Sequence, residues 1–486
     1  MSLRLYNTRT RTVEEFIPAR SGEVGIYVCG LTPSAQAHLG HARSFLFFDV
    51  LRRYLTHLGY RVTYVQNVTD IDDRSIEAAR RSGISWREIV AGFYSEFKAS
   101  MKKLGVREPD EEPYATSYIP QIRDAILGLV DRGYAYVVDD GIYYRVDRFA
   151  RYGELSQRNI TELEAGARIE IDEAKEHPLD FALWKFAKPG EPHWPFEPFG
   201  DGRPGWHIEC SAMSRALLDP EGIGFDIHGG GADLIFPHHE NEIAQSEPLM
   251  HRPPMARFWL HGGLLLFDNR KMSKSLGNFE PLTELLERYD PQAIRLLFLR
   301  TGYAKVMNFS EESIDGAVAT LERLRRDYRA LHERAAGRAA PPGKSGALMQ
   351  AIEAALNEDM NTAVALREIL AAAGAASTPG DAPERLRDLH DALVLLGLEP
   401  GEHWVTQLDS QSLPVNFIER LREELGEAFL DGSNNPEDAV ARVLLERMNA
   451  RARRDWARSD FLRDALARCG VDVKDSKEGS TWTVVA

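Results

Sequence analysis

The sequence predicts an α/β fold, with a parallel sheet and its helices followed by a helical region. Three observations support this prediction. The apolar run GIYVCG (25–30) precedes the helix-like SFLFFDVLRRYLTHLG (44–59), and RVTYVQNVTD (61–70) follows with many β-branched residues. The strand-like FDIHGGG (225–231) later restarts this order. After about residue 280 the apolar spacing is predominantly helical. Because strand–helix–strand order is typical of βα units, we expect the strands to run parallel.

The segment 118–200 interrupts this pattern and predicts an insertion into the sheet domain. It contains the short strand-like GIYYRV and ends in KPGEPHWPFEPFGDGRPG, where proline and glycine are frequent. A chain of 486 residues exceeds a single compact core, so we expect about three domains.

The composition is typical of a soluble globular protein, with 43% hydrophobic and 27% charged residues. We find no signal-peptide pattern at the amino terminus, and no apolar run approaches the about 18 residues that span a membrane. The cysteines Cys29, Cys210 and Cys469 are few and odd in number. We therefore expect no disulfide framework, no membrane partner and a cytoplasmic location.

The net charge of −15 disfavours a nucleic-acid partner, because phosphate binding needs a positive surface. The charge is unevenly distributed, however. Residues 321–344 contain seven basic and three acidic side chains, and residues 441–470 contain eight and four, so each segment carries about +4. These segments permit an RNA partner, although solvated helix faces are the simpler explanation.

The motif His38-Leu39-Gly40-His41 lies where a loop meets an apolar, helix-like stretch. The N-terminus of a helix presents unpaired N–H groups and a positive dipole end, which favour phosphate. The glycine allows a ligand to approach the backbone, and two imidazoles can donate hydrogen bonds to phosphoryl oxygens. So short a motif arises by chance, and alone it indicates nucleotide binding only weakly.

A second phosphate motif is NRKMSKSLGNF (269–279), a basic loop after the strand-like GLLLF. Lys271 and Lys274 lie three residues apart, and their ammonium groups suit the charge that develops on an α-phosphate and a departing pyrophosphate. An exposed basic loop is the alternative for a lone lysine pair. Together with the histidine motif upstream, the string favours phosphate chemistry.

A third group of residues is consistent with a metal site. Cys210 lies in GWHIECSAM, and FPHHENEIAQSE reads as a helix with its proline in the first turn. His238 and Glu242 are four residues apart on one face of that helix, but His239 and Glu242 at three apart are a geometrical rival. Two thiolates from Cys29 and Cys210, one imidazole and one carboxylate form a reasonable zinc set. The alternatives are buried apolar cysteines and a surface His/Glu pair.

These motifs together resemble the cysteinyl-tRNA synthetase family of class I aminoacyl-tRNA synthetases. The resemblance rests on HLGH, KMSKS, GWHIECSAM and DIHGGGADLIFPHHENEIAQSE, with a cysteine before the first loop. It extends over nearly the whole chain through YATSYIPQI, GELSQRNITELEAGAR, DFALWKFAKPGEPHWP, NEDMNTAVAL, ARRDWARSDFLRDAL and GSTW. Strings of this length and specificity do not match by chance.

The resemblance implies a function for individual positions. It selects His238 over His239, so that the zinc ligands are Cys29, Cys210, His238 and Glu242. The residues implied in catalysis are His38, His41, Lys271 and Lys274. The implied ATP contacts are His38, Gly40, His41, Asp233 and Lys274. The residues implied to line the cysteine pocket are Gly30, Thr69 and Trp206.

The resemblance also implies an activity and a domain order. L-cysteine and Mg-bound ATP would form cysteinyl-adenylate, and tRNA(Cys) would then accept cysteine at its 3' terminal adenosine. One zinc ion would select the substrate thiolate over the harder alcohol of serine. We expect a monomer. The implied order is a Rossmann-like catalytic domain (1–117 and 201–270), a connective insertion (118–200), the KMSKS loop and stem-contact region (271–318), a helical bundle (319–400), and a linker with the carboxy-terminal anticodon-binding domain (401–486).

The chain departs from the family in three places. Leu31-Thr32-Pro33-Ser34-Ala35 replaces the usual Pro-Thr-Val-Tyr-Asp, which puts the substrate contacts of this loop in doubt. AKVMNFSEE lacks the basic and proline residues of a YRSPLNYSEE-like stretch, so the contact with the tRNA stem is also in doubt. An extra segment at 414–435 has no readable purpose.

Three alternative functions are compatible with parts of the sequence. A mycothiol-pathway cysteine ligase resembles this family in fold and adenylation but ends before the anticodon-reading region. A non-catalytic tRNA-binding paralogue is suggested only by the altered loop. A structural zinc protein would leave KMSKS unexplained. Turnover, rather than zinc content, separates these alternatives.

Overall fold

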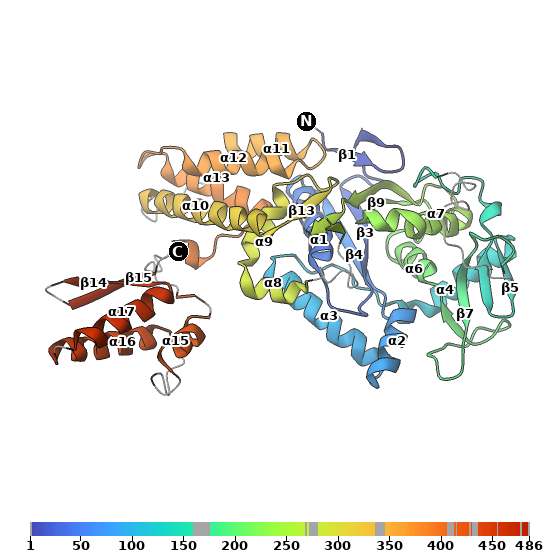
Figure 1. Cartoon of the computed structure of the whole chain (residues 1–486). Helices are drawn as coiled ribbons and strands as arrows, with labels where there is room; N and C mark the ends of the chain where they lie inside the picture. Colours follow the sequence, from blue (N-terminus) through green and yellow to red (C-terminus); the bar gives the residue numbers. More distant parts are fainter. Residues whose placement is uncertain are drawn as a thin grey trace. The chain divides into compact units, whose positions relative to one another are not determined.

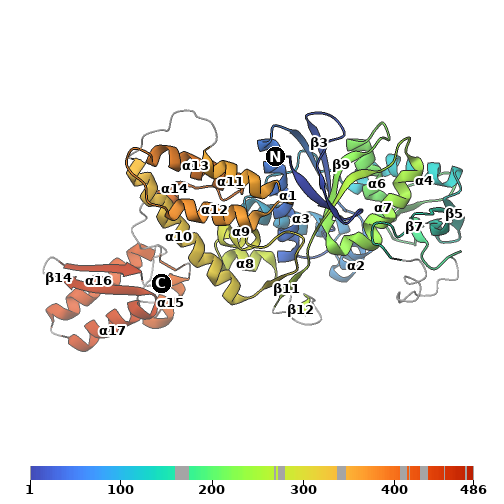
Figure 2. The same ribbon diagram turned by 90° about the horizontal axis from the view of Figure 1, so that it is seen from above.

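The computed structural model describes residues 2–158, 175–267, 270–271, 280–335, 346–405, 413–414, 416–426, 429, 436–453, 455–476 and 479–484. The chain divides into two compact units, Met1–Pro400 and Gly401–Ala486. Figure 1 shows the elements of each unit, and Figure 2 shows them from above.

A four-stranded parallel sheet forms the centre of the first unit. Its strand order is β10-β9-β3-β4, and every neighbouring pair is parallel. The helices α1 and α6 lie on opposite sides of this sheet (Figure 1). This arrangement confirms the predicted α/β fold. The bounds of these elements are β3 (Glu23–Leu31), α1 (Leu39–His57), β4 (Arg61–Val68), α6 (Trp206–Leu218), β9 (Phe225–Gly231) and β10 (Ala256–Gly262).

Close packing of α1 on the sheet explains two features of the sequence. The apolar residues of α1 that were expected to form a helix are buried, among them Phe48 and Leu51. A Cβ at Gly229 of β9 would lie 2.1 Å from the Phe48 ring, so only glycine fits beneath the helix. The HGGG string therefore has a packing function in addition to any role in ligand binding.

An antiparallel sheet of order β5-β6-β7-β8 covers the predicted insertion (118–200), except that its last strand, β8, lies just beyond residue 200. Its strands are β5 (Ala135–Val138), β6 (Gly141–Tyr144), β7 (Phe181–Phe186) and β8 (Gly202–Pro204). The buried Glu240 carboxylate joins this region to the central sheet domain, because it accepts N–H bonds from Gly153, Leu155 and Ser156 at 2.9, 3.4 and 2.8 Å. Glu240 begins α7 (Glu240–Ser246), which follows the short turns η3 (Ala232–Leu234) and η4 (Ile235–His239).

Smaller elements surround the sheet. The hairpin of β1 (Arg4–Asn7) and β2 (Thr12–Glu15) is antiparallel. The helices α2 (Asp73–Ser82) and α3 (Trp86–Lys103) lie between β4 and the insertion, and α4 (Ile119–Asp131) lies at the start of the insertion. Short turns occur at η1 (Ala115–Tyr118), η2 (Val146–Arg148) and η5 (Glu247–Leu249). A three-stranded sheet of order β12-β11-β13 follows β10, with β11 (Leu265–Phe267), β12 (Arg270–Lys271) and β13 (Met307–Phe309).

Helices complete both units. The first unit ends in α8 (Leu282–Arg288), α9 (Pro291–Leu299), α10 (Glu311–Ala335), α11 (Ala347–Leu356), α12 (Thr362–Gly374) and α13 (Ala382–Leu395). The second contains α14 (Glu402–Val405), α15 (Phe417–Leu425), α16 (Pro436–Ala452), α17 (Trp456–Arg468) and the antiparallel hairpin of β14 (Val471–Ser476) and β15 (Gly479–Val484). Its core includes Phe417, Leu462 and Cys469. Within the described ranges, every helix is too short or too polar to cross a membrane.

A buried ion network ties α1 to α9. The Asp49 carboxylate accepts hydrogen bonds from Arg53 Nε at 2.9 Å and Arg295 Nη2 at 2.5 Å. Arg295 also donates to the carbonyls of Leu396 and Leu104 at 2.7 and 3.1 Å. Burial raises the pKa of Asp49, but the charges of Arg295 and Arg53 outweigh it and hold the pKa below its ordinary value.

Candidate active site and metal centre

A pocket of about 1110 Å³ opens at the carboxyl ends of β3, β9 and β10. This edge of a parallel sheet is where open α/β folds bind ligands. The structure gathers most of the predicted site residues here. Those that line the pocket are Cys29, Gly30, His38, Gly40, His41, Trp206 and Asp233.

The other predicted residues are Cys210, His238 and Glu242, which are buried beneath the pocket, and Thr69, Lys271 and Lys274. Thr69 is buried just after β4 and is not among the residues that line the pocket, and its hydroxyl is 3.3 Å from the Asn67 amide. The backbone of Lys271 ends β12, but its side chain is outside the described part of the chain. Lys274 lies wholly outside the described residues, with the rest of 272–279.

The four predicted metal ligands meet at one point beneath the pocket. Their ligand atoms lie within 4.8 Å of one another, and all four residues are buried. Cys29 Sγ lies 3.7 Å from Cys210 Sγ and 3.4 Å from Glu242 Oε1. His238 Nε2 lies 3.1 Å from the same Glu242 oxygen. β3, α6, η4 and α7 each supply one ligand.

These separations fit a tetrahedral zinc site. Zinc–sulfur bonds of about 2.3 Å at a tetrahedral angle place two sulfurs about 3.8 Å apart, and zinc–nitrogen or zinc–oxygen bonds of about 2.0–2.1 Å place those atoms about 3.3 Å apart. The observed 3.7 Å between sulfurs and 3.1 Å between nitrogen and oxygen are close to these values. The donor set of two sulfurs, one nitrogen and one oxygen is one that zinc accepts.

The rival histidine is less well placed. The ligand atoms of Cys29, His228, His239 and Glu242 also lie within 4.8 Å of one another. His239 Nε2, however, lies 4.0 Å from Glu242 Oε1, and its Nδ1 is engaged by His261 Nε2 at 2.7 Å. The set with His239 also lacks the second thiolate. The geometry therefore favours His238, which spacing along the helix did not select.

The pKa shifts within the cluster indicate which of its side chains are charged near pH 7 and which are neutral. Burial lowers the pKa of His238, but the Glu242 carboxylate and the Cys210 sulfur outweigh it and raise this pKa to about 10. Burial raises the pKa of Glu242, yet His228 and His238 lower it to about 2. Burial likewise opposes ionisation of Cys210, while hydrogen bonds from Cys29 and His238 bring its pKa to about 6. Burial, followed by Cys210, raises the pKa of Cys29 well above its ordinary value. A divalent cation would take the place of the His238 proton and the Cys29 proton.

Other histidines orient these ligands, and sequence reasoning missed them. His228 Nε2 lies 2.8 Å from Glu242 Oε2, so that Oε1 remains directed at the cluster. His207 Nδ1 lies 2.9 Å from His238 Nδ1, which leaves Nε2 directed at Glu242. Partners of this kind fix the orientation of metal ligands. Both histidines belong to the quoted strings DIHGGG and GWHIECSAM, so their presence in ligand-bearing motifs was the available signal.

The phosphate motif forms the N-terminus of α1. His38 is the N-cap, and its Nδ1 accepts the Gly40 N–H at 3.0 Å. His41 Nδ1 accepts the His38 N–H at 3.2 Å, and the two rings stack with centroids 3.9 Å apart. Burial, followed by the charge of His38, lowers the pKa of His41 to about 3, so this ring is neutral near pH 7. Because Nδ1 accepts a hydrogen bond in both rings, each ring carries its proton on Nε2.

The wall above the cluster is built from a narrow backbone contact and an indole. A Cβ at Gly30 would lie 1.6 Å from the Asn67 carbonyl oxygen, so any other residue would displace β3 from β4. The Trp206 ring lies 4.3 Å from the His238 ring and is 37% exposed, which leaves one face for a ligand. The altered loop also lines the pocket through Leu31, Thr32, Ser34 and Ala35.

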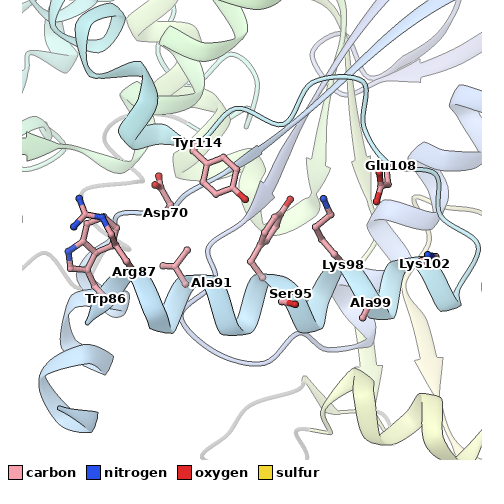
Figure 3. Close-up of a pocket in the computed structure, with 12 residues that line it drawn as sticks. Asp70, Trp86, Arg87, Ala91, Ser95, Lys98, Ala99, Lys102, Glu108 and Tyr114 are labelled. Atoms are coloured by element: carbon pink, nitrogen blue, oxygen red, sulfur yellow. The ribbon is translucent and has the colours of Figure 1, made fainter. Parts of the chain in front are cut away.

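A second hollow of about 630 Å³ follows α3 (Figure 3). Asp70, Arg87 and Trp86 lie at one end, and Lys98, Glu108 and Lys102 lie toward the other. None of the predicted site residues lines it. The predicted chemistry therefore belongs to the larger pocket at the sheet edge.

Comparison with known proteins finds two matching family models and full-length relatives. Residues 15–319 match the family described as tRNA synthetases class I (C) catalytic domain, and residues 436–482 match the Cysteinyl-tRNA ligase anticodon binding domain. A protein named Cysteine--tRNA ligase from Geobacter metallireducens is 41% identical, and the alignment covers 100% of both chains. Another of that name, from Pseudomonas paraeruginosa, is 42% identical over 99% of both chains.

Solved structures share the fold at low identity. Methionyl-tRNA synthetase from Mycobacterium tuberculosis, in complex with methionyl-adenylate, has a TM-score of 0.54 at 14% identity, over 77% of this chain and 89% of that one. LeuRS from Agrobacterium radiobacter, in a ternary complex with tRNA, has a TM-score of 0.57 at 13% identity, over 79% and 87%. These likenesses support a synthetase fold, and the full-length relatives specify the branch. The chain belongs to the cysteine–tRNA ligase family of class I aminoacyl-tRNA synthetases.

Proposed function

We propose that this protein activates L-cysteine with ATP and transfers the cysteinyl group to the 3' terminal adenosine of tRNA(Cys). The observation that carries this proposal is a single pocket that holds two kinds of chemistry. The imidazoles of the α1 N-terminus line it, and the buried Cys/His/Glu cluster reaches it through Cys29. An amino acid that carries a thiol and a carboxylate would touch both.

Amino-acid selection belongs to the buried cluster. We assign Cys29, Cys210, His238 and Glu242 as zinc ligands, because their donor types and separations fit that ion. Zinc held there would bind a soft thiolate in preference to the harder alcohol of serine. Gly30 leaves no side chain above Cys29, and Trp206 lies against His238, so these residues would enclose a small substrate.

Activation of the substrate belongs to the α1 N-terminus. A carboxylate is already ionised at pH 7, so its attack on the α-phosphorus needs no general base. A bond forms between a carboxylate oxygen and the α-phosphorus. The bond from the α-phosphorus to the oxygen that bridges it to the β-phosphate breaks, and pyrophosphate leaves with that oxygen. The Nε2–H groups of His38 and His41 would donate to phosphoryl oxygens, and Lys271 and Lys274 would meet the charge that develops there. Mg²⁺ would accompany ATP, Gly40 leaves room for its phosphates, and Asp233 would face its ribose.

Transfer to tRNA involves the second unit. A ribose hydroxyl of the terminal adenosine attacks the carbonyl carbon of the mixed anhydride, and AMP leaves. The match to an anticodon-binding domain over residues 436–482 supports a tRNA contact there. We propose that the arginine-rich segments 321–344 and 441–470 face tRNA. A monomeric state and a cytoplasmic location stay predictions.

The experiment that tests this function is charging of total tRNA with labelled cysteine, with serine in parallel. We expect charging with cysteine alone. Cysteine-dependent pyrophosphate exchange without charging would point to a ligase with another acceptor, as in the mycothiol pathway. Absence of both reactions would contradict the proposal and favour a binding paralogue.

The tRNA-facing assignment has its own test. Arg453 is exposed and pairs with Glu446 at 3.0 Å, so it can exchange that partner for a phosphate. The double substitution Arg453→Ala and Arg454→Ala should raise KM for tRNA by about tenfold and flatten its salt dependence. Pyrophosphate exchange is the control and should not change. Unchanged charging at every salt concentration would contradict the assignment.

A further inference from the structure

Arg43 is a buried cation of α1 with an unusual set of partners. It lies two residues after His41 and is 5% exposed. Its guanidinium donates to five backbone carbonyls: Gly263 and Leu264 at 3.0 and 2.9 Å, and Gly302, Tyr303 and Lys305 at 3.3, 3.3 and 2.5 Å. No carboxylate of the described residues pairs with it. Burial lowers its pKa to about 10, so it stays charged near pH 7.

The five carbonyls belong to two segments that support the predicted lysine motif. Gly263 and Leu264 directly precede β11, which pairs with the Arg270–Lys271 strand β12. Gly302, Tyr303 and Lys305 lie in the turn before β13, which is parallel to β11. Arg43 therefore binds both strands at the point where they begin.

The two segments meet backbone to backbone, and this leaves little tolerance for change. Gly263 N–H donates to the Tyr303 carbonyl at 2.7 Å, and Met307 N–H donates to the Leu264 carbonyl at 3.0 Å. A Cβ at Gly263 would lie 2.3 Å from the Lys305 carbonyl oxygen. The Arg43 guanidinium thus fills a junction whose walls are carbonyl oxygens.

The opposite side of the same helix turn carries the imidazoles of the pocket. His38 and His41 line the pocket, and so do Gly262, Gly263 and Leu264. One side chain therefore fixes the helix with the histidines against the wall that leads to Lys271. An arginine can bind five carbonyls because its planar guanidinium spreads five N–H donors over three nitrogens. A lysine has only three donors, all on one nitrogen.

We propose that Arg43 is a positioning residue for adenylate formation, which sets the spacing between the α1 histidines and the β11–β12 hairpin that carries Lys271. The inference rests on the proposed function. A purely structural residue would affect stability and leave the rate of the chemical step nearly unchanged. A positioning residue instead requires that kcat falls in a variant that still folds.

The test is pyrophosphate exchange by Arg43→Lys. We expect kcat to fall by about 100-fold, as for misplacement of reacting groups by about 1 Å, with KM for cysteine unchanged. Zinc content should also stay unchanged. The matched control is Arg295→Lys, which alters a fully buried arginine in the Asp49 network. That variant should have a larger loss of melting temperature and a kcat within about threefold of the wild type.

Gly263→Ala keeps the test decisive if Arg43→Lys does not fold. Its Cβ would press on the Lys305 carbonyl and shift the same junction with Arg43 intact, so kcat should fall here too. A kcat near the wild-type value in a folded Arg43→Lys, or in Gly263→Ala, would overturn the inference. So would a loss of kcat in Arg295→Lys that matches the loss in Arg43→Lys. Absence of exchange in the wild type would instead refute the proposed function.

Discussion

The first unit contains two buried clusters of charged side chains. They differ in whether the polar atoms in and beside them have hydrogen-bond partners. In the Asp49 network, Arg295 Nε and Nη1 donate to backbone carbonyls, and Nη2 donates to the Asp49 carboxylate. The Cys29/Cys210/His238/Glu242 cluster, which is the candidate metal site, opens onto the pocket through Cys29. Beside it, among the described residues, His228 Nδ1 and His239 Nε2 lack a hydrogen-bond partner. A closed network of this kind serves stability, whereas unsatisfied groups next to paired sulfurs indicate a binding site.

The largest expected effect tests the open cluster. Cys210→Ala should lose its zinc, and its kcat/KM for cysteine in pyrophosphate exchange should fall by about 10³-fold, because several kcal/mol of selective binding would be removed. Metal analysis and exchange kinetics measure both quantities. Cys469→Ala is the matched control, since this buried cysteine belongs to the core of the second unit. Full zinc occupancy in Cys210→Ala would show that the cluster is not the metal site.

The closed network should respond in stability and not in zinc affinity. Asp49→Asn leaves the buried Arg295 guanidinium without its carboxylate, while Arg53 keeps Glu399 at 3.0 Å, and should cost about 3–5 kcal/mol in the unfolding of the first unit. Denaturant unfolding measures this cost, and zinc titration of the folded variant should match the wild type. An altered zinc affinity would mean that the two clusters are coupled.

The same network predicts a pH dependence. Because the pKa of Asp49 in the folded protein lies below its ordinary value, its stabilisation is present above about pH 4 and is lost as the pH falls through the folded pKa. The advantage of the wild type over Asp49→Asn should therefore shrink below about pH 4. An advantage that stays constant down to pH 2 would contradict the assigned ionisation.

A smaller effect on zinc binding is expected from His228, which contacts the predicted ligand Glu242 without being a ligand itself. His228→Gln removes the ring that holds Glu242 Oε2 and should weaken zinc binding by about 10- to 100-fold. His261→Gln alters a neighbour that contacts Thr8 and His239 but no ligand, and should change zinc affinity by less than about threefold. Equal losses in the two variants would indicate a general effect on packing.

Local patterns predicted much of this fold and site, and long-range contacts account for what they missed. The position of HLGH at the start of α1 follows from the sequence, because capping and the helix dipole are properties of one helix turn. The choice between His238 and His239 needed the positions of Cys29 and Cys210, which come from other elements. Thr69, which the resemblance places in the cysteine pocket, is buried after β4, and its role stays a prediction. The Arg295–Asp49 pair joins residues 246 apart, and no local spacing reveals such a partner.

The central claim is that the buried cluster selects a thiol substrate for activation at the α1 N-terminus. The most direct measurement is amino-acid-dependent pyrophosphate exchange, with cysteine and serine compared in the zinc-loaded and the chelator-treated protein. We predict exchange with cysteine, at least about 10³-fold less with serine, and loss of the cysteine reaction without metal. Equal exchange with serine, or full activity after complete removal of the metal, would contradict the claim.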